Sequence, residues 1–209
     1  MRQCCVGVAA IATLVSVSSC AIEGQPISVA DSGHAGSVIR QADDNGVRLP
    51  FETRHANRWN AANDGTTYEP CTAVSGSNLA EAGLVPSTVA DAAGTNGQTL
   101  RGCTWDYQRS SLGDSWTLTQ IVGNSRGLDS EKRLKSTSSD VWLPDREMDS
   151  RLVGVHRTNG VWSCDTYVQS GRAAVSTIVN HFGTAKPDPD EICERALAFT
   201  RATIDKMPL

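Results

Sequence analysis

The sequence lacks the features that mark several common classes of protein. Its 19 Lys and Arg and 23 Asp and Glu give a formal net charge of −4, and the basic residues form no long run. Binding to nucleic acid depends on neutralising many phosphates, so nucleic acid is not an expected partner. The acidic turn at residues 43–46 lacks the alternating ligands and the distal Glu of an EF-hand, so we interpret it as a solvated turn.

The spacing of the histidines also argues against a metal site. No two histidines stand at the i, i+4 spacing of a helical metal site; the four are His34, His55, His156 and His181. We expect surface or hydrogen-bonded structural roles for them. The sequence therefore predicts no metal, no cofactor and no catalytic residue, although a Ser-His-Asp triad is defined in space rather than in sequence.

The first 20 residues differ from the rest of the chain. Arg2 is their only charge, an apolar stretch covers residues 4–17, and the segment ends Val17-Ser18-Ser19-Cys20. This pattern is typical of a secretory signal, and the stretch is shorter than the ~20 residues of a transmembrane helix. The ending resembles a bacterial lipobox, in which diacylglycerol is attached to the cysteine. We predict a signal peptide at residues 1–19 and a lipid on Cys20, which anchors the protein to the outer face of the cell membrane.

An ordinary cleaved signal with an incidental cysteine is the alternative. Ser16 and Ser18 supply the small residues that such a signal carries before its cleavage site. For the lipoprotein hypothesis, the two chains of diacylglycerol matter because one acyl chain alone binds a membrane only marginally.

The rest of the chain divides into a tether and one domain. Residues 20–57 are rich in Gly, Ser and Asp and hold few large apolar side chains. Such a segment buries too little surface to offset its ordering entropy, so we predict a flexible tether. Residues 58–209 are long enough for a single domain with its own core.

The cysteine count indicates two disulfides. Cys4 and Cys5 lie in the predicted signal and Cys20 takes the lipid, so four cysteines remain: Cys71, Cys103, Cys164 and Cys193. An even number in an exported chain favours disulfides, because the space outside the membrane is oxidising. Of the three pairings, we favour the sequence-local one, in which each bond closes about 30 residues and stabilises by ~3.5 kcal/mol. Zinc is the competing use, but no two of the four are separated by the short gaps of structural zinc sites.

Alternating patterns predict strands in the second half of the chain. Residues 99–122 indicate a hairpin around a turn-rich centre. Residues 152–157 and 161–168 flank Thr158-Asn159-Gly160, whose Asn-Gly pair is a strong hairpin signal. Residues 173–182 are rich in Val, Ile and Thr, which predicts a fifth strand.

Capping signals predict helices before, between and after these strands. We expect a short helix at residues 77–82, a polar helix at 130–135 capped by Asp129, and a C-terminal helix that begins at Asp188-Pro189-Asp190-Glu191. Together the elements predict an α+β fold. It has an antiparallel sheet of about five strands with flanking helices, including the C-terminal helix, and is braced by two disulfides.

Several stretches resemble a known family. They are residues 68–74 (YEPCTAV), 82–84 (AGL), 102–105 (GCTW), Cys164 and residues 190–196 (DEICERA). With the lipobox, this ordered set resembles a family of actinobacterial envelope lipoproteins known only as a domain of unknown function. The resemblance runs from about residue 66 to the end of the chain. It implies a mycobacterial-type host and the outer face of its membrane, and it carries over no catalytic residue.

Trp142 is the candidate interaction residue. It lies in Val141-Trp142-Leu143-Pro144, which we interpret as a short apolar stretch inside a polar loop. An apolar patch on a loop is a better candidate for binding than one on a strand. Core packing is the competing interpretation, and it is the one we favour for Trp105 and Trp162.

These observations lead to a hypothesis of a non-enzymatic binding or interaction module at the cell envelope. Its expected partner, besides the membrane that holds the lipid, is a small ligand, a lipid or another envelope protein. The alternative is an envelope hydrolase that acts on cell-wall or lipid material. A His-Asp or His-Glu pair with a shifted pKa in a cleft would favour the hydrolase. A deep apolar cavity without titratable groups would favour ligand carriage.

Overall fold

The computed structural model describes residues 39–97, 99–108, 114–125, 127–136, 139–158 and 162–209. The predicted signal peptide, Cys20, His34 and the Asn-Gly turn at residues 159–160 lie outside the described residues. Within the described ranges, no helix is long and apolar enough to cross a membrane.

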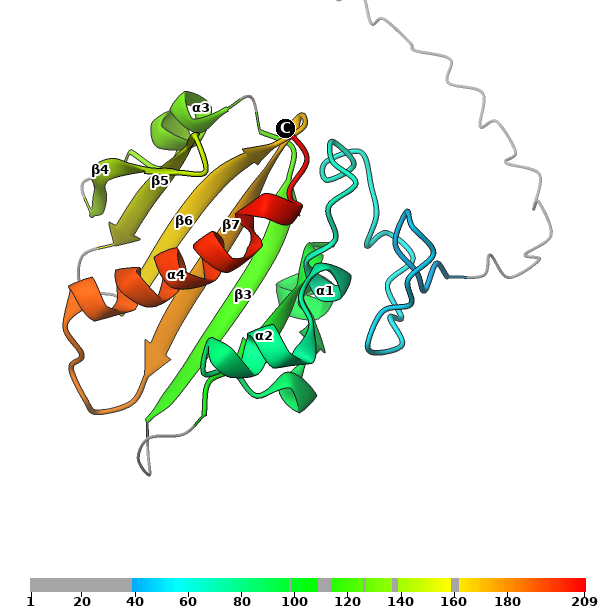
Figure 1. The fold of residues 1–209 in the computed structure, drawn as a ribbon, viewed down its shortest axis with the longest axis horizontal. Coiled ribbons are helices and arrows are strands. Elements are labelled where there is room, and N and C mark those ends of the chain that lie inside the picture. The colour runs from blue at the N-terminus through cyan, green and yellow to red at the C-terminus, as the bar shows by residue number, and fades with distance from the viewer. Residues whose placement is uncertain (1–38, 98, 109–113, 126, 137–138, 159–161) are drawn as a thin grey trace, which may run out of the picture. The chain divides into compact units, whose positions relative to one another are not determined.

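A single antiparallel sheet forms the centre of the fold (Figure 1). Its seven strands lie in the order β1-β2-β3-β7-β6-β5-β4. They are β1 (Ala90–Asp91), β2 (Arg101–Asp106), β3 (Ser115–Gly123), β4 (Asp140–Met148), β5 (Arg151–Thr158), β6 (Ser163–Ser170) and β7 (Ala173–Phe182). The long β3–β7 pairing, from Ser115↔Phe182 to Gly123↔Ala174, joins the two predicted hairpins into one sheet. The α+β prediction is confirmed, but the sheet has seven strands rather than about five.

The two additional strands are the edges of the sheet. β1 has two residues, too few for an alternating pattern. β4 holds Pro144 and the charged residues 145–147, and its register with β5 shifts between Leu143 and Arg146. Proline, charge and a bulge are what edge strands carry to prevent further pairing, and they also erase the period-two signal. The interpretation of residues 141–144 as a loop is therefore wrong, because they belong to β4.

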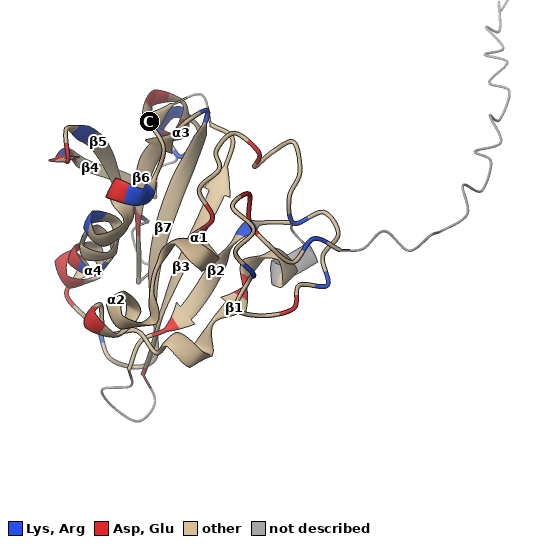
Figure 2. Ribbon diagram, turned by 45° about the vertical axis from the view of Figure 1, so that its right-hand side comes forward, with Lys and Arg blue, Asp and Glu red and all other residues tan. Residues whose placement is uncertain are grey.

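In the part of the chain that the structure describes, four α-helices and three short 3₁₀ helices accompany the sheet. They are α1 (Pro70–Ala73), α2 (Gly76–Glu81), α3 (Leu128–Leu134), α4 (Pro189–Thr203), η1 (Pro86–Thr88), η2 (Ala92–Gly97) and η3 (Ile204–Lys206). Asp188 caps α4 as predicted, since its side chain accepts from the Asp190 amide at 2.9 Å. The predicted cap of α3 is wrong: Gly127 occupies the N-cap position and Asp129 lies in the first turn. Figure 2 shows that acidic and basic residues are interspersed over the described elements.

Both disulfides hold a helix against a strand. Cys71 of α1 bonds Cys103 of β2, and Cys164 of β6 bonds Cys193 of α4. This is the sequence-local pairing. A helix as short as α1 is not stable by itself. The Cys71–Cys103 bond ties it to β2 within the core.

α4 lies along β6 and β7 on one face of the sheet (Figure 1). Part of this interface is polar and fully paired. Gln120 Nε2 donates to Thr177 Oγ1 at 2.9 Å and to Thr203 Oγ1 at 3.2 Å, and Thr166 and Thr200 share a hydrogen bond of 2.5 Å. Because a displaced helix would leave these buried groups unpaired, the hydroxyls fix the position of α4 on the sheet.

Residues 39–57, the last part of the predicted tether, lie against the domain. Thr72 of α1 donates to Asp43 Oδ2 at 2.6 Å, Arg40 stacks over the Trp59 ring at 4.3 Å, and Leu49 is buried. Gln41 and Thr53 exchange side chain–backbone bonds of 2.9 and 3.0 Å. The composition of this segment resembles a linker, but a few specific contacts order it. The boundary at residue 58 remains a prediction based on composition.

A buried charge network connects this N-terminal part to the sheet. Arg58 binds Glu69 through two parallel hydrogen bonds of 2.8 Å, and Arg101 Nε reaches the same carboxylate at 3.2 Å. Arg58 Nε also pairs with Asp91 Oδ1 at 3.1 Å. Burial acts to lower the pKa of both guanidinium groups, and the nearby carboxylates act to raise it. At Arg58 the Glu69 and Asp91 carboxylates outweigh burial and raise the pKa, whereas at Arg101 burial prevails and lowers it.

We predict that Glu69→Gln destabilises the protein by about 3–5 kcal/mol, because two buried guanidinium groups lose their shared carboxylate. Urea unfolding at constant slope measures the change. The matched control is Asp44→Asn, which breaks the exposed Arg40–Asp44 pair of 2.5 Å and should cost less than about 1 kcal/mol. Equal losses in the two variants would contradict a structural role for the network.

Candidate ligand-binding site

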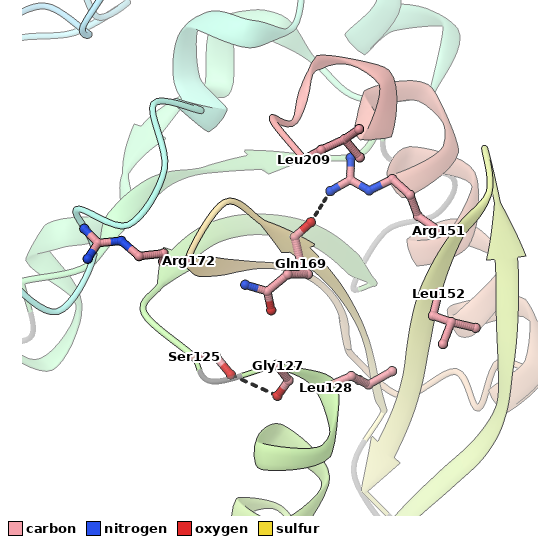
Figure 3. A pocket seen from close by; sticks show the side chains of 8 residues that line it. All are labelled: Ser125, Gly127, Leu128, Arg151, Leu152, Gln169, Arg172 and Leu209. Atoms are coloured by element: carbon pink, nitrogen blue, oxygen red, sulfur yellow. Dashed lines mark hydrogen bonds between the residues drawn. The ribbon is translucent and has the colours of Figure 1, made fainter.

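A cavity of about 760 Å³ opens at the end of the sheet where β5 begins and β6 ends. Its size is within the range of small-molecule sites. The residues that line it come from the β3–α3 connection and the start of α3, from β5, from the end of β6 and the turn after it, and from the C-terminal segment (Figure 3). They are Ser125, Gly127, Leu128, Arg151, Leu152, Gln169, Arg172 and Leu209.

Two glycines allow these segments to meet. A Cβ on Gly154 would lie 2.3 Å from Leu128 Cδ1, so glycine at this place in β5 lets the start of α3 pack onto the sheet. Gly171 turns the chain between β6 and β7 with φ +55°, and a Cβ there would approach Gly65 O to 2.7 Å. The next residue, Arg172, donates its amide to the same Gly65 carbonyl at 2.9 Å.

Three leucines make the cavity apolar on one side. Leu152 is 63% exposed and Leu209 is 96% exposed, which is unusual for large aliphatic side chains, and Leu128 is half-buried beside them. Exposed apolar residues that gather around a concavity indicate a binding site more strongly than scattered ones. Leu134 of α3 is 75% exposed and does not line the cavity, so it can serve as a control for the exposed leucines that do.

Arg151 holds the C-terminal segment at the cavity wall. Its Nη1 donates to Ile204 O and Met207 O at 2.9 Å each, and its Nη2 donates to Gln169 O. Burial lowers the pKa of Arg151, against the opposing influence of Asp149. An arginine remains charged at any physiological pH. The three carbonyls satisfy donors of this guanidinium without cancelling its charge.

Arg172 lies on the opposite rim from Leu152 (Figure 3). It also lines a second cavity of about 410 Å³, which it shares with Ser125 and with Ala61, Asp64 and Asn124. Among the described residues, no side-chain hydrogen bond or ion pair occupies its guanidinium, which is exposed. Arg172 is therefore a cation without a side-chain partner among the described residues, and it lies between an apolar cavity and a polar one.

Two histidines pair with carboxylates away from these cavities. His156 Nδ1 is 3.3 Å from Asp165 Oδ2, and His181 Nε2 is 3.5 Å from Asp114 Oδ1. Asp165 also accepts from Ser163 Oγ at 3.4 Å and from the Tyr167 hydroxyl at 3.0 Å. In a hydrolase triad the serine hydroxyl bonds the histidine, whereas Ser163 bonds the aspartate.

Trp142 lies near His156 and not at the cavity. Its ring packs against His156 at 4.9 Å and Tyr167 at 5.5 Å, and Lys132 Nζ lies 5.8 Å from its centroid. The indole is half-buried, and within the described part of the chain its Nε1 has no hydrogen-bond partner. An interaction role for Trp142 remains a prediction. Trp105 is fully buried and Trp162 packs against the core.

Sequence reasoning missed the residues of the cavity. One available signal was Leu152, an apolar residue on the same face of β5 as His156. A second was Gly123-Asn124-Ser125-Arg126-Gly127, whose letters match the Gly-x-Ser-x-Gly pattern between a strand and a helix.

The serine of that pattern lacks the geometry of a nucleophile elbow. In the described ranges, the non-glycine residues with positive φ are Asp149 and Ser150, so Ser125 is not held in a strained turn. Its Oγ donates to Gly127 O at 3.2 Å rather than to a histidine. The described cavity lining includes no His, Asp or Glu side chain. Over the described residues, no cluster of three or more His, Cys, Asp or Glu is arranged to hold a metal.

Comparison with known proteins identifies the family of this chain but not an activity. No curated protein and no solved structure matches it. A family described as "Protein of unknown function (DUF3558)" matches residues 15–206, which is most of the chain. The actinobacterial host and the lipid anchor remain predictions. The chain therefore belongs to the DUF3558 family of proteins of unknown function.

Proposed function

We propose that this protein is a lipoprotein on the outer face of an actinobacterial cell membrane. There it acts as a non-enzymatic module that binds a small apolar or amphipathic ligand. The observation that carries the proposal is the cavity of about 760 Å³ between Leu128, Leu152 and Leu209. Leaving such leucines open to water is unfavourable unless a ligand or partner covers them.

The location is supported by the N-terminal sequence and by the disulfides. Val17-Ser18-Ser19-Cys20 resembles a lipobox, and the two disulfides suit an oxidising compartment. A domain held close to a membrane by a lipid encounters the lipids and lipid precursors of that membrane. An apolar cavity in such a domain suits ligands from this source.

The envelope hydrolase is the second candidate because Ser125 both matches a nucleophile pattern and lines the cavity. What it lacks is a base: its hydroxyl faces Gly127 O, and the His156–Asp165 pair is elsewhere. A serine hydroxyl without an adjacent base is a weak nucleophile. Binding without chemistry therefore accounts better for the cavity.

We predict that Cys20→Ala moves the protein from the membrane fraction to the soluble fraction of its host and abolishes its labelling with a radioactive fatty acid. The physical reason is the loss of the thiol that would carry both acyl chains. Fractionation and autoradiography of the two forms measure this. Cys5→Ala, inside the predicted signal, is the control and should change neither result. Persistent labelling of the Cys20 variant would exclude the predicted anchor.

We predict that Leu152→Ser weakens binding of the uncharged fluorescent probe N-phenyl-1-naphthylamine about tenfold, because part of the apolar wall is lost. Leu134→Ser removes an equally exposed leucine outside the cavity and should leave binding unchanged. Both side chains are exposed, so neither substitution should shift stability by more than about 0.5 kcal/mol. Identical titrations for the two variants would show that the probe binds elsewhere or not at all.

We predict that Ser125→Ala leaves binding of the same probe within about twofold of the unsubstituted chain, since Ser125 contributes one small polar group to the wall. A p-nitrophenyl ester assay of both chains tests the hydrolase candidate, and we expect no enzymatic turnover in either. Turnover that disappears in the Ser125 variant would reject the non-enzymatic part of the proposal.

A further inference from the structure

Two cavities of opposite character meet at Ser125 and Arg172. The first is lined by the three leucines described above, and the second by Asp64 and Asn124. A ligand that spans both would place an apolar part against the leucines and a polar part beyond Arg172. A ligand with these two parts is an amphiphile rather than a purely apolar molecule.

The charges at the junction favour an anion. Arg172 has no side-chain partner in the described part of the chain, and Asp64, although it lines the same cavity, forms no ion pair with it. Arg151 adds a second positive charge, whose hydrogen bonds go to backbone carbonyls and which the Asp149 carboxylate opposes in part. The chain has a net charge of −4, whereas the described lining of the apolar cavity holds two arginines and no Asp or Glu side chain, which is a local reversal of side-chain charge. Such a reversal attracts anions selectively.

The polar cavity limits the charge that the anion can carry and the groups that can accompany it. Asn124 Nδ2 donates to Asp64 Oδ1 at 2.7 Å and to Ala61 O at 2.8 Å, while Asn124 Oδ1 accepts from Gly65 N at 2.8 Å. The amide is thus fully used, and the Asp64 carboxylate still has acceptor capacity. A bare dianion would be repelled by Asp64. A singly charged phosphodiester with hydroxyl groups matches both Arg172 and Asp64, because hydroxyls donate to a carboxylate.

We infer that the ligand is an anionic phospholipid with a hydroxyl-bearing head group. Its acyl chain lies along Leu128 and Leu152, its phosphate meets Arg172, and its hydroxyls reach the polar cavity. The inference rests on the proposed binding function and specifies its ligand. Guanidinium and phosphate form paired, charge-assisted hydrogen bonds, which makes Arg172 the residue that selects the head group.

The test uses the full chain, extracted from its host in a nonionic detergent and examined by native mass spectrometry. Three probes are titrated: palmitoyl lysophosphatidylglycerol, monopalmitoylglycerol without a phosphate, and glycerol 3-phosphate without a chain. We expect the lysophospholipid to bind at least about tenfold more tightly than either of the others. Arg172→Gln should reduce its affinity to that of monopalmitoylglycerol. Arg201→Gln, which alters an exposed arginine of α4 outside both cavities, should change nothing.

The outcomes separate this inference from the proposed function. Equal binding of the lysophospholipid and monopalmitoylglycerol, or an unaltered affinity in the Arg172 variant, overturns the anionic head group but leaves the binding module in place. Tight binding of glycerol 3-phosphate alone overturns the lipid in favour of a free phosphate ester. If neither lipid binds, the proposed function fails together with the inference. Arg172 is exposed, so a melting temperature equal to that of the unsubstituted chain shows that its variant is folded.

Discussion

The carboxylate of Glu69 is the interaction on which much of this structure depends. It holds Arg58 and Arg101 together, and Arg101 in turn donates to the carbonyls of Asn63, Thr66 and Tyr68. The loop fixed in this way presents Gly65 O to Arg172 N, and it contributes Asp64 to the polar cavity. A buried ion pair thus positions a surface arginine through one loop, without touching the site itself.

This arrangement explains why arginine and not lysine stands at both cationic positions. Arg101 donates to a carboxylate and to three carbonyls at once, and only a guanidinium has enough donors in a fixed plane to do so. Taking such charges out of water is costly, so the network is weak evidence for high stability. What it specifies is one conformation of a loop that has no regular secondary structure of its own.

The sequence was most informative where a pattern is local. β5, β6 and β7 and the Asp188 cap of α4 each rest on residues close in the chain, and each agrees with the structure. The two disulfides, which join residues 32 and 29 positions apart, were predicted instead from the even number of cysteines that remain after the signal and the lipid site. The edge strand β4 was missed because the proline, charges and bulge that protect an edge also remove its alternation. The Glu69 network and the cavity were missed for another reason. They bring together charged and apolar residues from separate segments, such as Arg101 with Glu69 and Leu128 with Arg172, and nothing in a single sequence marks which of its many charged or apolar residues will meet.

The cavity lies outside the core, and this separates the proposed binding site from the residues that stabilise the fold. The face of the sheet under α4 is covered by the α4 side chains and the buried hydroxyls. Leu152, Leu209 and Arg172 are exposed and add little to the free energy of folding. A family built on this frame is therefore free to change the wall and the rim of the cavity while keeping the disulfides and the Glu69 network. Ligand preference should then follow the identity of positions 152 and 172, and the shared fold alone should not be used to assign one ligand to all members.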